Sequence, residues 1–197
     1  MKIEVRADGA HISGYVNATG KKSRPVITPH GKCIEVIEER AFERALERAG
    51  DVTVSVDHDK SHIYASTSDS TLKLYEDNIG LHADVLIIDP ELIALAKKGK
   101  IRGWSFGMRN VVDELEQRAD DLPIRHVKDF VLDHITLVVN KMPIYAATSV
   151  EVRAGEDDYL LECRAIDTKI DLVVADEPPK PNYSDYENRI SSLKTAE

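Results

Sequence analysis

The sequence has few of the features that mark secreted, membrane or disulfide-bonded proteins. Its 197 residues include only two cysteines, Cys33 and Cys163, which is too few for a disulfide framework, and neither lies in a metal-binding spacing. No apolar run approaches the roughly 18 residues of a membrane helix, and the N-terminus lacks the apolar segment of a signal peptide. We therefore expect a chain made and used in a cytosol, with structural or incidental thiols, no membrane contact and no cofactor.

Positive charge is scarce as well. The chain carries 26 lysines and arginines against 35 acidic residues, for a net charge of -9. A protein that tracks nucleic-acid phosphates needs a basic patch, so the charge balance argues against a nucleic-acid partner. With 42% hydrophobic residues the chain can still build an ordinary core. The length favours one domain, with room for a tail.

Alternating apolar and polar segments, bounded by turn residues, predict a mostly β chain. The polar stretch 20–25 predicts a loop, and 141–143 predicts a break. The predicted strands are 12–16, 33–37, 52–56, 71–75, 80–87, 101–112, 130–139 and 149–153.

Only two helices are expected. Residues 38–49 carry apolar side chains at helical spacing, and a second helix begins at Pro90 with Asp89 as its cap. The fold class is therefore mostly β with a few short helices (α+β).

The composition changes after residue 153 and becomes acidic. Further on, the stretch Asp-Glu-Pro-Pro-Lys-Pro at 176–181 is unsuited to regular packing. We predict a domain over 1–153, a C-terminal extension over 154–175 and a mobile, disordered tail over 176–197.

The segment Ile-Arg-Gly-Trp-Ser-Phe-Gly-Met-Arg at 101–109 carries the clearest chemical pattern. Because side chains alternate along a strand, Ser105 shares one face with Gly103 and Gly107, and three large apolar residues share the other. A hydroxyl between two glycines leaves open backbone for an approaching peptide. Taken alone, the pattern fits a β-bulge or a crowded crossing better than a nucleophile. It also differs from the nucleophile elbow of hydrolases, because it follows a helix instead of preceding one.

Two histidines are candidate partners, since a serine hydroxyl needs a base and histidine is the usual one. His58 ends a valine-rich strand between two acids, although, taken alone, a solvent-exposed loop histidine explains that pattern better than a catalytic base does. His134 lies on a strand face with Thr136, while Asp133 is expected to point the opposite way. A polar residue on an apolar strand needs a hydrogen-bond partner, which another histidine or a backbone carbonyl would supply.

Taken together, these segments resemble the caudovirus prohead serine proteases over about residues 14–152. That family is similar in fold to the herpesvirus assemblins, which implies a β-barrel surrounded by helices. The matching blocks are Gly-Tyr-Val (14–16), Glu-Val-Ile-Glu-Glu-Arg-Ala-Phe (35–42), Val-Asp-His-Asp (56–59), Gly-Leu-His-Ala-Asp-Val-Leu (80–86), Lys-Gly-Lys-Ile-Arg-Gly-Trp-Ser-Phe-Gly-Met (98–108) and Pro-Ile-Tyr-Ala-Ala-Thr-Ser-Val (143–150).

The resemblance implies a serine endopeptidase with Ser105 as nucleophile and His58 as base. The third member should lie in the strand that holds Asp133 and His134. The phage pattern often has a carboxylate where this chain has His134, whereas a histidine there matches the herpesvirus arrangement, so we assign His134. Backbone N–H groups near 107–109 are the candidates for an oxyanion hole.

The resemblance also implies partners: the phage major capsid protein with its delta segment, the scaffold protein, and the chain itself through self-cleavage. Cleavage would occur inside the assembling prohead in the host cytoplasm, with the gene carried by a phage or a prophage. The herpesvirus analogy adds a homodimer. One alternative stays open, in which the chain is a catalytically inactive relative that binds capsid protein as a scaffold.

Overall fold

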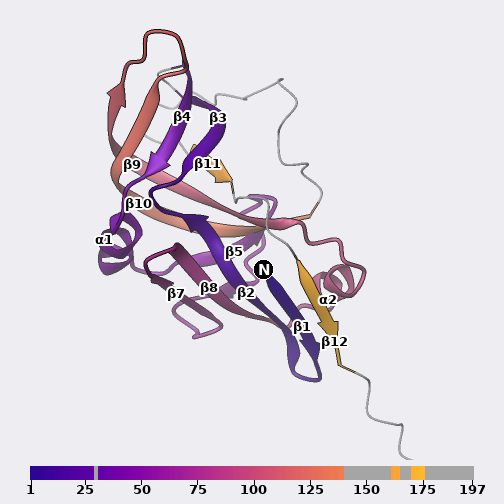
Figure 1. Ribbon diagram of the computed structural model, residues 1–197. Helices are drawn as coiled ribbons and strands as arrows, with labels where there is room; N and C mark the ends of the chain where they lie inside the picture. Colours follow the sequence, from indigo (N-terminus) through magenta and orange to yellow (C-terminus); the bar gives the residue numbers. More distant parts are fainter. Residues whose placement is uncertain (29–30, 140–160, 165–169, 176–197) are drawn as a thin grey trace, which may run out of the picture.

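The computed structural model describes residues 1–28, 31–139, 161–164 and 170–175, which form twelve strands and two short helices (Figure 1). This content confirms the expected mostly β, α+β class. The strands are β1 (Lys2–Arg6), β2 (Gly9–Ala18), β3 (Lys22–Thr28), β4 (Gly31–Ile37), β5 (Thr53–Val56), β6 (Ala65–Ser66), β7 (Leu72–Glu76), β8 (Gly80–Ile87), β9 (Gly103–Glu116), β10 (Ile124–Val138), β11 (Leu161–Arg164) and β12 (Asp171–Val174). The helices are α1 (Ala41–Arg48) and α2 (Pro90–Lys97).

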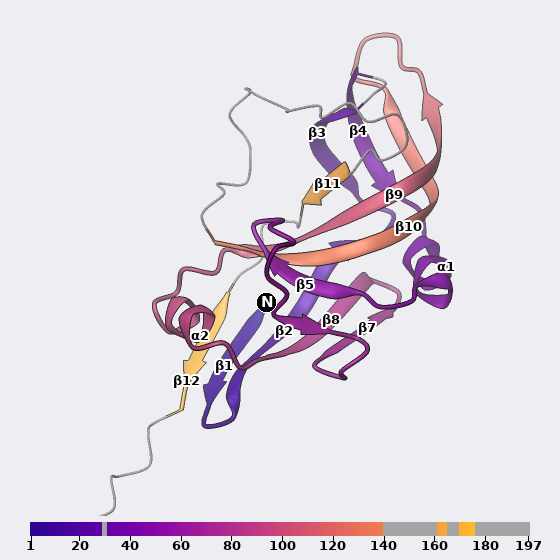
Figure 2. The same ribbon diagram turned by 180° about the vertical axis from the view of Figure 1, so that it is seen from behind.

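The strands form two sheets. A five-stranded sheet has the order β12-β1-β2-β8-β7, and a seven-stranded sheet has the order β11-β9-β10-β4-β3, with β5 and β6 attached to β10. Within the described residues the strand pairings do not close into a barrel, so the barrel part of the prediction is not confirmed. Figure 2 shows the two sheets from behind, with α1 and α2 at opposite ends.

The long strand β10 organises the seven-stranded sheet. It pairs antiparallel with β9 along most of its length, and its C-terminal half pairs parallel with β5 on the other side. The register places Thr136 opposite both Ser105 of β9 and Ser55 of β5. Three segments that are far apart in the sequence therefore lie side by side at this point.

The core confirms the face assignment made for β9. Trp104, Phe106 and Met108 are all buried, and Phe106 packs edge-on against Phe42 of α1, with 5.0 Å between ring centroids. Phe42 also packs against Phe130 of β10 at 5.1 Å. The apolar side of β9 thus anchors the strand, which fixes the backbone position of its polar side.

Several predicted boundaries were wrong, and three of them have a clear cause. The expected loop at 20–25 is largely β3, which tolerates Pro25 because β3 is the edge of its sheet and needs fewer N–H donors. Helix α1 begins at Ala41 instead of residue 38, because Arg40 takes a left-handed conformation with φ of 65°. Strand β10 begins at Ile124, six residues earlier than expected, where it also pairs with β4.

The hairpin β7–β8 and the start of α2 confirm the prediction. The Asp89 side chain accepts a hydrogen bond from the Leu92 backbone at 2.8 Å, and Pro90 follows it at the first helical position. The predicted break at 141–143, the strand at 149–153 and the tail at 176–197 lie outside the described residues.

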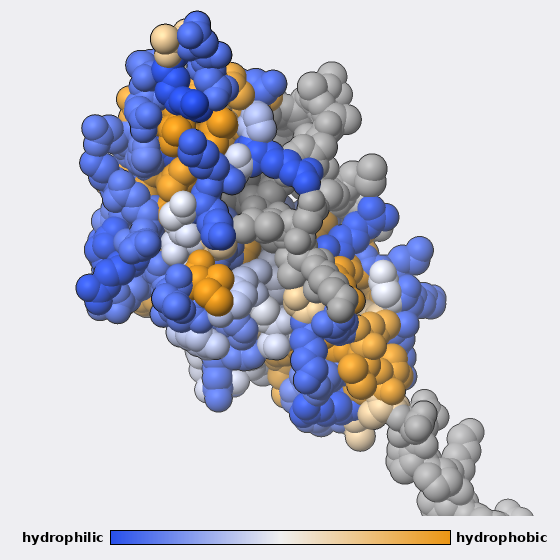
Figure 3. Space-filling view, in the orientation of Figure 1, coloured by the Kyte–Doolittle hydropathy of each residue, from blue (hydrophilic) through white to orange (hydrophobic). Residues whose placement is uncertain are grey.

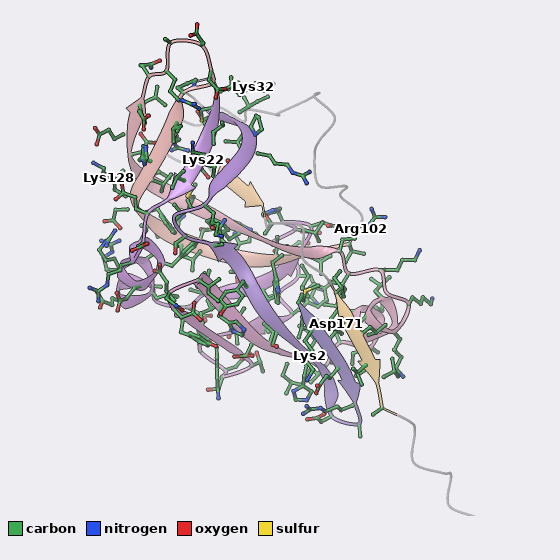
Figure 4. All side chains as sticks on the ribbon, in the orientation of Figure 1. Lys2, Lys22, Lys32, Arg102, Lys128 and Asp171 are labelled. Carbon is green, nitrogen blue, oxygen red and sulfur yellow. The ribbon has the colours of Figure 1, made fainter. Side chains whose placement is uncertain are left out.

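The C-terminal extension contributes two strands that were not predicted. Strand β12 runs parallel to β1, with Asp171 opposite Lys2, and Figure 4 labels both residues on these adjoining strands. Apolar residues gather at the surface over β12 (Figure 3), where Leu172, Val173 and Val174 are exposed. Strand β11 pairs antiparallel with β9 at the edge of the other sheet.

Candidate active site

The structure brings Ser105, His58 and His134 together. Ser105 lies on β9, His134 lies on the adjacent β10, and His58 follows β5 on the far side of β10. The Ser105 hydroxyl is 3.0 Å from Nε2 of His58, and Nδ1 of His58 is 2.9 Å from Nε2 of His134. The two imidazole rings meet nearly at right angles, with an interplanar angle of 83°.

A strained turn carries His58 to this position. Asp57 and His58 both adopt left-handed backbone conformations, with φ of 49° and 61°. Residues other than glycine occupy this region at a cost, so the turn must be held by its surroundings. The backbone N–H of His58 donates to the Thr136 hydroxyl at 3.1 Å, and the Asp57 carboxylate accepts from the Val139 backbone at 2.9 Å. Strand β10 therefore supports the turn as well as supplying His134.

The prediction that Asp133 points away from His134 was wrong. The β9–β10 register shifts between Leu132 and His134, and this irregularity lies at Asp133. A bulge places two residues opposite one and so breaks the simple alternation of side chains. Oδ2 of Asp133 lies 2.8 Å from Nδ1 of His134.

Two positive side chains hold the Asp133 carboxylate. Nε of Arg109 lies 2.7 Å from its Oδ1, and Lys60 forms an ion pair with its Oδ2. Burial acts to raise the pKa of Asp133, but hydrogen bonds from Lys60 and His134, together with the charge of Arg109, hold it below its ordinary value of 3.8. Asp133 is therefore a carboxylate at neutral pH. The sequence did not predict that the side chain of Lys60 or of Arg109 would lie here.

The carboxylate fixes where the protons lie. An ionised carboxylate only accepts hydrogen bonds, so Nδ1 of His134 must carry a proton toward Asp133. When His134 is neutral, its Nε2 is then an acceptor, and Nδ1 of His58 donates to it. This arrangement leaves Nε2 of neutral His58 as an acceptor for the Ser105 hydroxyl. Such a chain is suited to removing the proton from Ser105.

A model of the caudovirus prohead serine proteases matches residues 1–160, most of the chain. The chain belongs to this family. The match agrees with the resemblance drawn from the sequence blocks, and the family implies a serine peptidase. Searches of curated proteins and of solved structures found no match.

The polar groups of the prohead protease site are largely buried. Ser105 is 2% exposed and His134 is 1% exposed, whereas His58 is half-buried. A low-dielectric setting strengthens hydrogen bonds between these groups and raises the cost of leaving one without a partner.

Cys33 has a different environment. Its side chain is buried, and burial raises the pKa of its thiol, so the reactive thiolate is disfavoured. This supports the structural role expected for Cys33. In the described part of the chain, neither helix is long and apolar enough to cross a membrane.

Replacing Asp133 with asparagine preserves its size and removes its charge. We expect Asp133→Asn to lower the free energy of unfolding at pH 7 by about 1–2 kcal/mol, because hydrogen bonds to a charged group are lost. The folded-state pKa of Asp133 is lowered. The contribution of its charge to the stability of the fold is therefore fully present above pH 3.8, its ordinary pKa, and is lost as the pH falls through the folded-state pKa. The free energy of unfolding, measured by urea denaturation, should therefore differ less between Asp133→Asn and the unaltered protein below about pH 4.

The matched control is Asp120→Asn, in an exposed loop, which should change the free energy of unfolding by less than about 0.5 kcal/mol at any pH. A difference for Asp133→Asn that stays constant down to about pH 2 would show that its charge is not the source of the stabilisation.

Proposed function

We propose that this chain is an active serine endopeptidase of prohead maturation, with Ser105 as nucleophile, His58 as base and His134 as the third member. The observation that carries the proposal is the unbroken series of contacts from the Ser105 hydroxyl through both histidines to the Asp133 carboxylate. A scaffold-only relative has no need for three successive hydrogen-bond contacts that end on a serine hydroxyl. The series therefore favours the enzyme over the inactive alternative.

In this mechanism Oγ of Ser105 attacks the carbonyl carbon of the scissile peptide bond, and its proton passes to Nε2 of His58. The carbon–nitrogen bond then breaks as His58 returns the proton to the leaving amine, and an acyl ester remains on Ser105. Water, deprotonated by His58, then attacks the ester carbon, the bond between that carbon and Oγ breaks, and His58 returns the proton to Ser105. Each proton transfer uses the 3.0 Å contact between His58 and Ser105, or its equivalent to the leaving group or water.

His134 has the role that a carboxylate fills in the familiar triad. It keeps Nδ1 of His58 protonated and stabilises the positive charge that His58 gains. A neutral imidazole does this less well than a carboxylate, which predicts slow turnover. Asp133 offsets part of that weakness, because its negative charge, 2.8 Å from Nδ1 of His134, stabilises the positive charge that the histidine pair gains. We assign Asp133 as a positioning residue, since it acts on the substrate only through the histidines.

The family supports phage capsid-assembly proteins as substrates. We propose the major capsid protein with its delta segment, the scaffold protein and the chain itself, cleaved within the assembling prohead in the host cytoplasm. The homodimer and the closed barrel implied by the assemblin likeness remain predictions.

Ser105→Ala is expected to abolish cleavage of the capsid and scaffold proteins and to abolish covalent labelling by a fluorophosphonate, because both need the hydroxyl. The fold should be unchanged by circular dichroism. Ser23→Ala is the matched control, since the Ser23 hydroxyl bonds the Glu35 backbone at 2.8 Å and not a histidine. Normal cleavage by Ser105→Ala would place the nucleophile elsewhere.

His134→Ala is expected to reduce kcat by about 100-fold or more without stopping the reaction, because His58 keeps its contact with Ser105 but loses its orientation. The matched control is His126→Ala, which removes another histidine of β10 that pairs with Glu116 at 3.1 Å. Steady-state kinetics on a cleaved peptide would measure both. Unchanged kinetics in His134→Ala would remove His134 from the site.

Asp133→Asn is expected to lower kcat by about tenfold with little change in KM, and to move the acid limb of the pH–rate profile to lower pH. The shift follows because loss of a negative charge makes protonation of the histidine pair less favourable. A purely structural role would lower the amount of active enzyme without moving the limb. A profile that keeps its limb in place would therefore remove Asp133 from the relay.

A further inference from the structure

The edge of the nucleophile strand is occupied by the chain's own C-terminal extension. β11 lies antiparallel along β9 on the side away from β10, and both views of the ribbon show the two strands side by side (Figures 1 and 2). The paired residues are Leu161 with Met108, Glu162 with Gly107, Cys163 with Phe106 and Arg164 with Ser105. The pairing therefore reaches the nucleophile itself.

β11 is not part of the matched family domain. The family match ends at residue 160, and β11 begins at Leu161. Beyond it the extension is attached a second time, through β12. There the Asp171 backbone donates to the Met1 carbonyl at 3.0 Å, and the Ala175 backbone donates to the Val5 carbonyl at 2.9 Å. The extension thus contacts the domain on both sheets, and one of its two contacts is the strand that carries Ser105.

A peptide substrate needs the same kind of surface. Exposed sheet edges bind extended peptides by adding them as a further strand, whose backbone supplies the hydrogen bonds. In the described residues β10 fills one edge of β9 at Ser105, so only the edge now held by β11 is left for a peptide. Two residues before Ser105, a Cβ added at Gly103 would meet no atom within 4 Å. In this arrangement Ser105 is 2% exposed.

We propose that residues 161–164 are an intramolecular competitor that occupies the strand position in which an extended substrate peptide binds beside Ser105. The proposal rests on the function proposed above and assigns its regulation. A tethered segment competes at an effective concentration on the order of millimolar, so dilute peptides are excluded. Capsid and scaffold proteins packed at high density would displace β11, and the enzyme would act only where they are concentrated.

Proline substitutions test this in the full-length Ser105→Ala chain, which binds without cleaving. Backbone groups of successive residues in an edge strand face alternately toward its neighbour and away from it. Glu162→Pro and Cys163→Pro therefore remove N–H groups that face opposite sides of β11. The variant that removes an N–H facing β9 should weaken the pairing. The other is the matched control, because proline is tolerated on the outer side of an edge strand. The probe is a fluorescein-labelled synthetic peptide with the sequence of residues 158–167, and anisotropy measures its binding.

One proline variant is expected to bind the labelled peptide at least about tenfold more tightly than the parent chain, and the other is expected to bind as the parent does. Equal, unchanged affinity in both variants would overturn the proposal. A second measurement needs no proline. In the Ser105→Ala chain, excess unlabelled peptide should accelerate hydrogen exchange of the amides of 161–164 while those of 105–108 stay protected, and unaltered exchange at 161–164 would contradict displacement.

These measurements are separate from the test of the proposed enzyme. Fluorophosphonate labelling of Ser105 is measured in Glu162→Pro and Cys163→Pro chains that keep the hydroxyl, so that β11 cannot shield it in the variant that loses the strand, whereas the binding tests use a chain that lacks the hydroxyl. Absent labelling with a positive binding result would reject the enzyme and keep the competing strand. Normal labelling with unchanged binding in both proline variants would keep the enzyme and reject the competing strand.

Discussion

The site depends on one interaction, the contact between the Asp133 carboxylate and Nδ1 of His134. A carboxylate has no proton to give, so this contact decides that Nδ1 of His134 is the protonated nitrogen. Nε2 of His134 then accepts a hydrogen bond, which decides that Nδ1 of His58 is the protonated nitrogen of that ring. In the proposed mechanism, the ability of His58 to accept the Ser105 proton follows from Asp133, which lies two contacts away. Arg109 and Lys60 matter for the same reason, since they keep Asp133 ionised.

Strand β10 is the element that makes this arrangement possible. Its bulge turns Asp133 toward His134, its Thr136 hydroxyl holds the backbone of His58, and its two neighbours carry Ser105 and the strand leading to His58. The left-handed turn at Asp57 and His58 costs free energy that these hydrogen bonds offset. Packing of Phe106 and Phe130 against Phe42 secures the other side of the sheet, so the polar side is held rigidly.

Much of the fold could be predicted, because local pattern decides it. The alternating β7–β8 hairpin and the Asp89 cap of α2 have short-range causes. The failures have long-range causes. Pro25 is tolerated in β3 only because that strand is an edge, and the first residues of β10 are a strand because they pair with β4. The pairing of β11 with β9 joins segments more than 50 positions apart, a separation that residue patterns do not encode.

For the site, the sequence by itself determined the candidate residues, a serine between glycines and two histidines at strand positions, and the order of blocks that marks the family. Only the tertiary structure decided how they are connected. Alternation along a strand predicted that Asp133 and His134 diverge, and a bulge reversed that outcome. Lys60 and Arg109 gave no signal, because an ion pair forms between elements whose relative position is set by sheet pairing and packing, not by their neighbours in the chain.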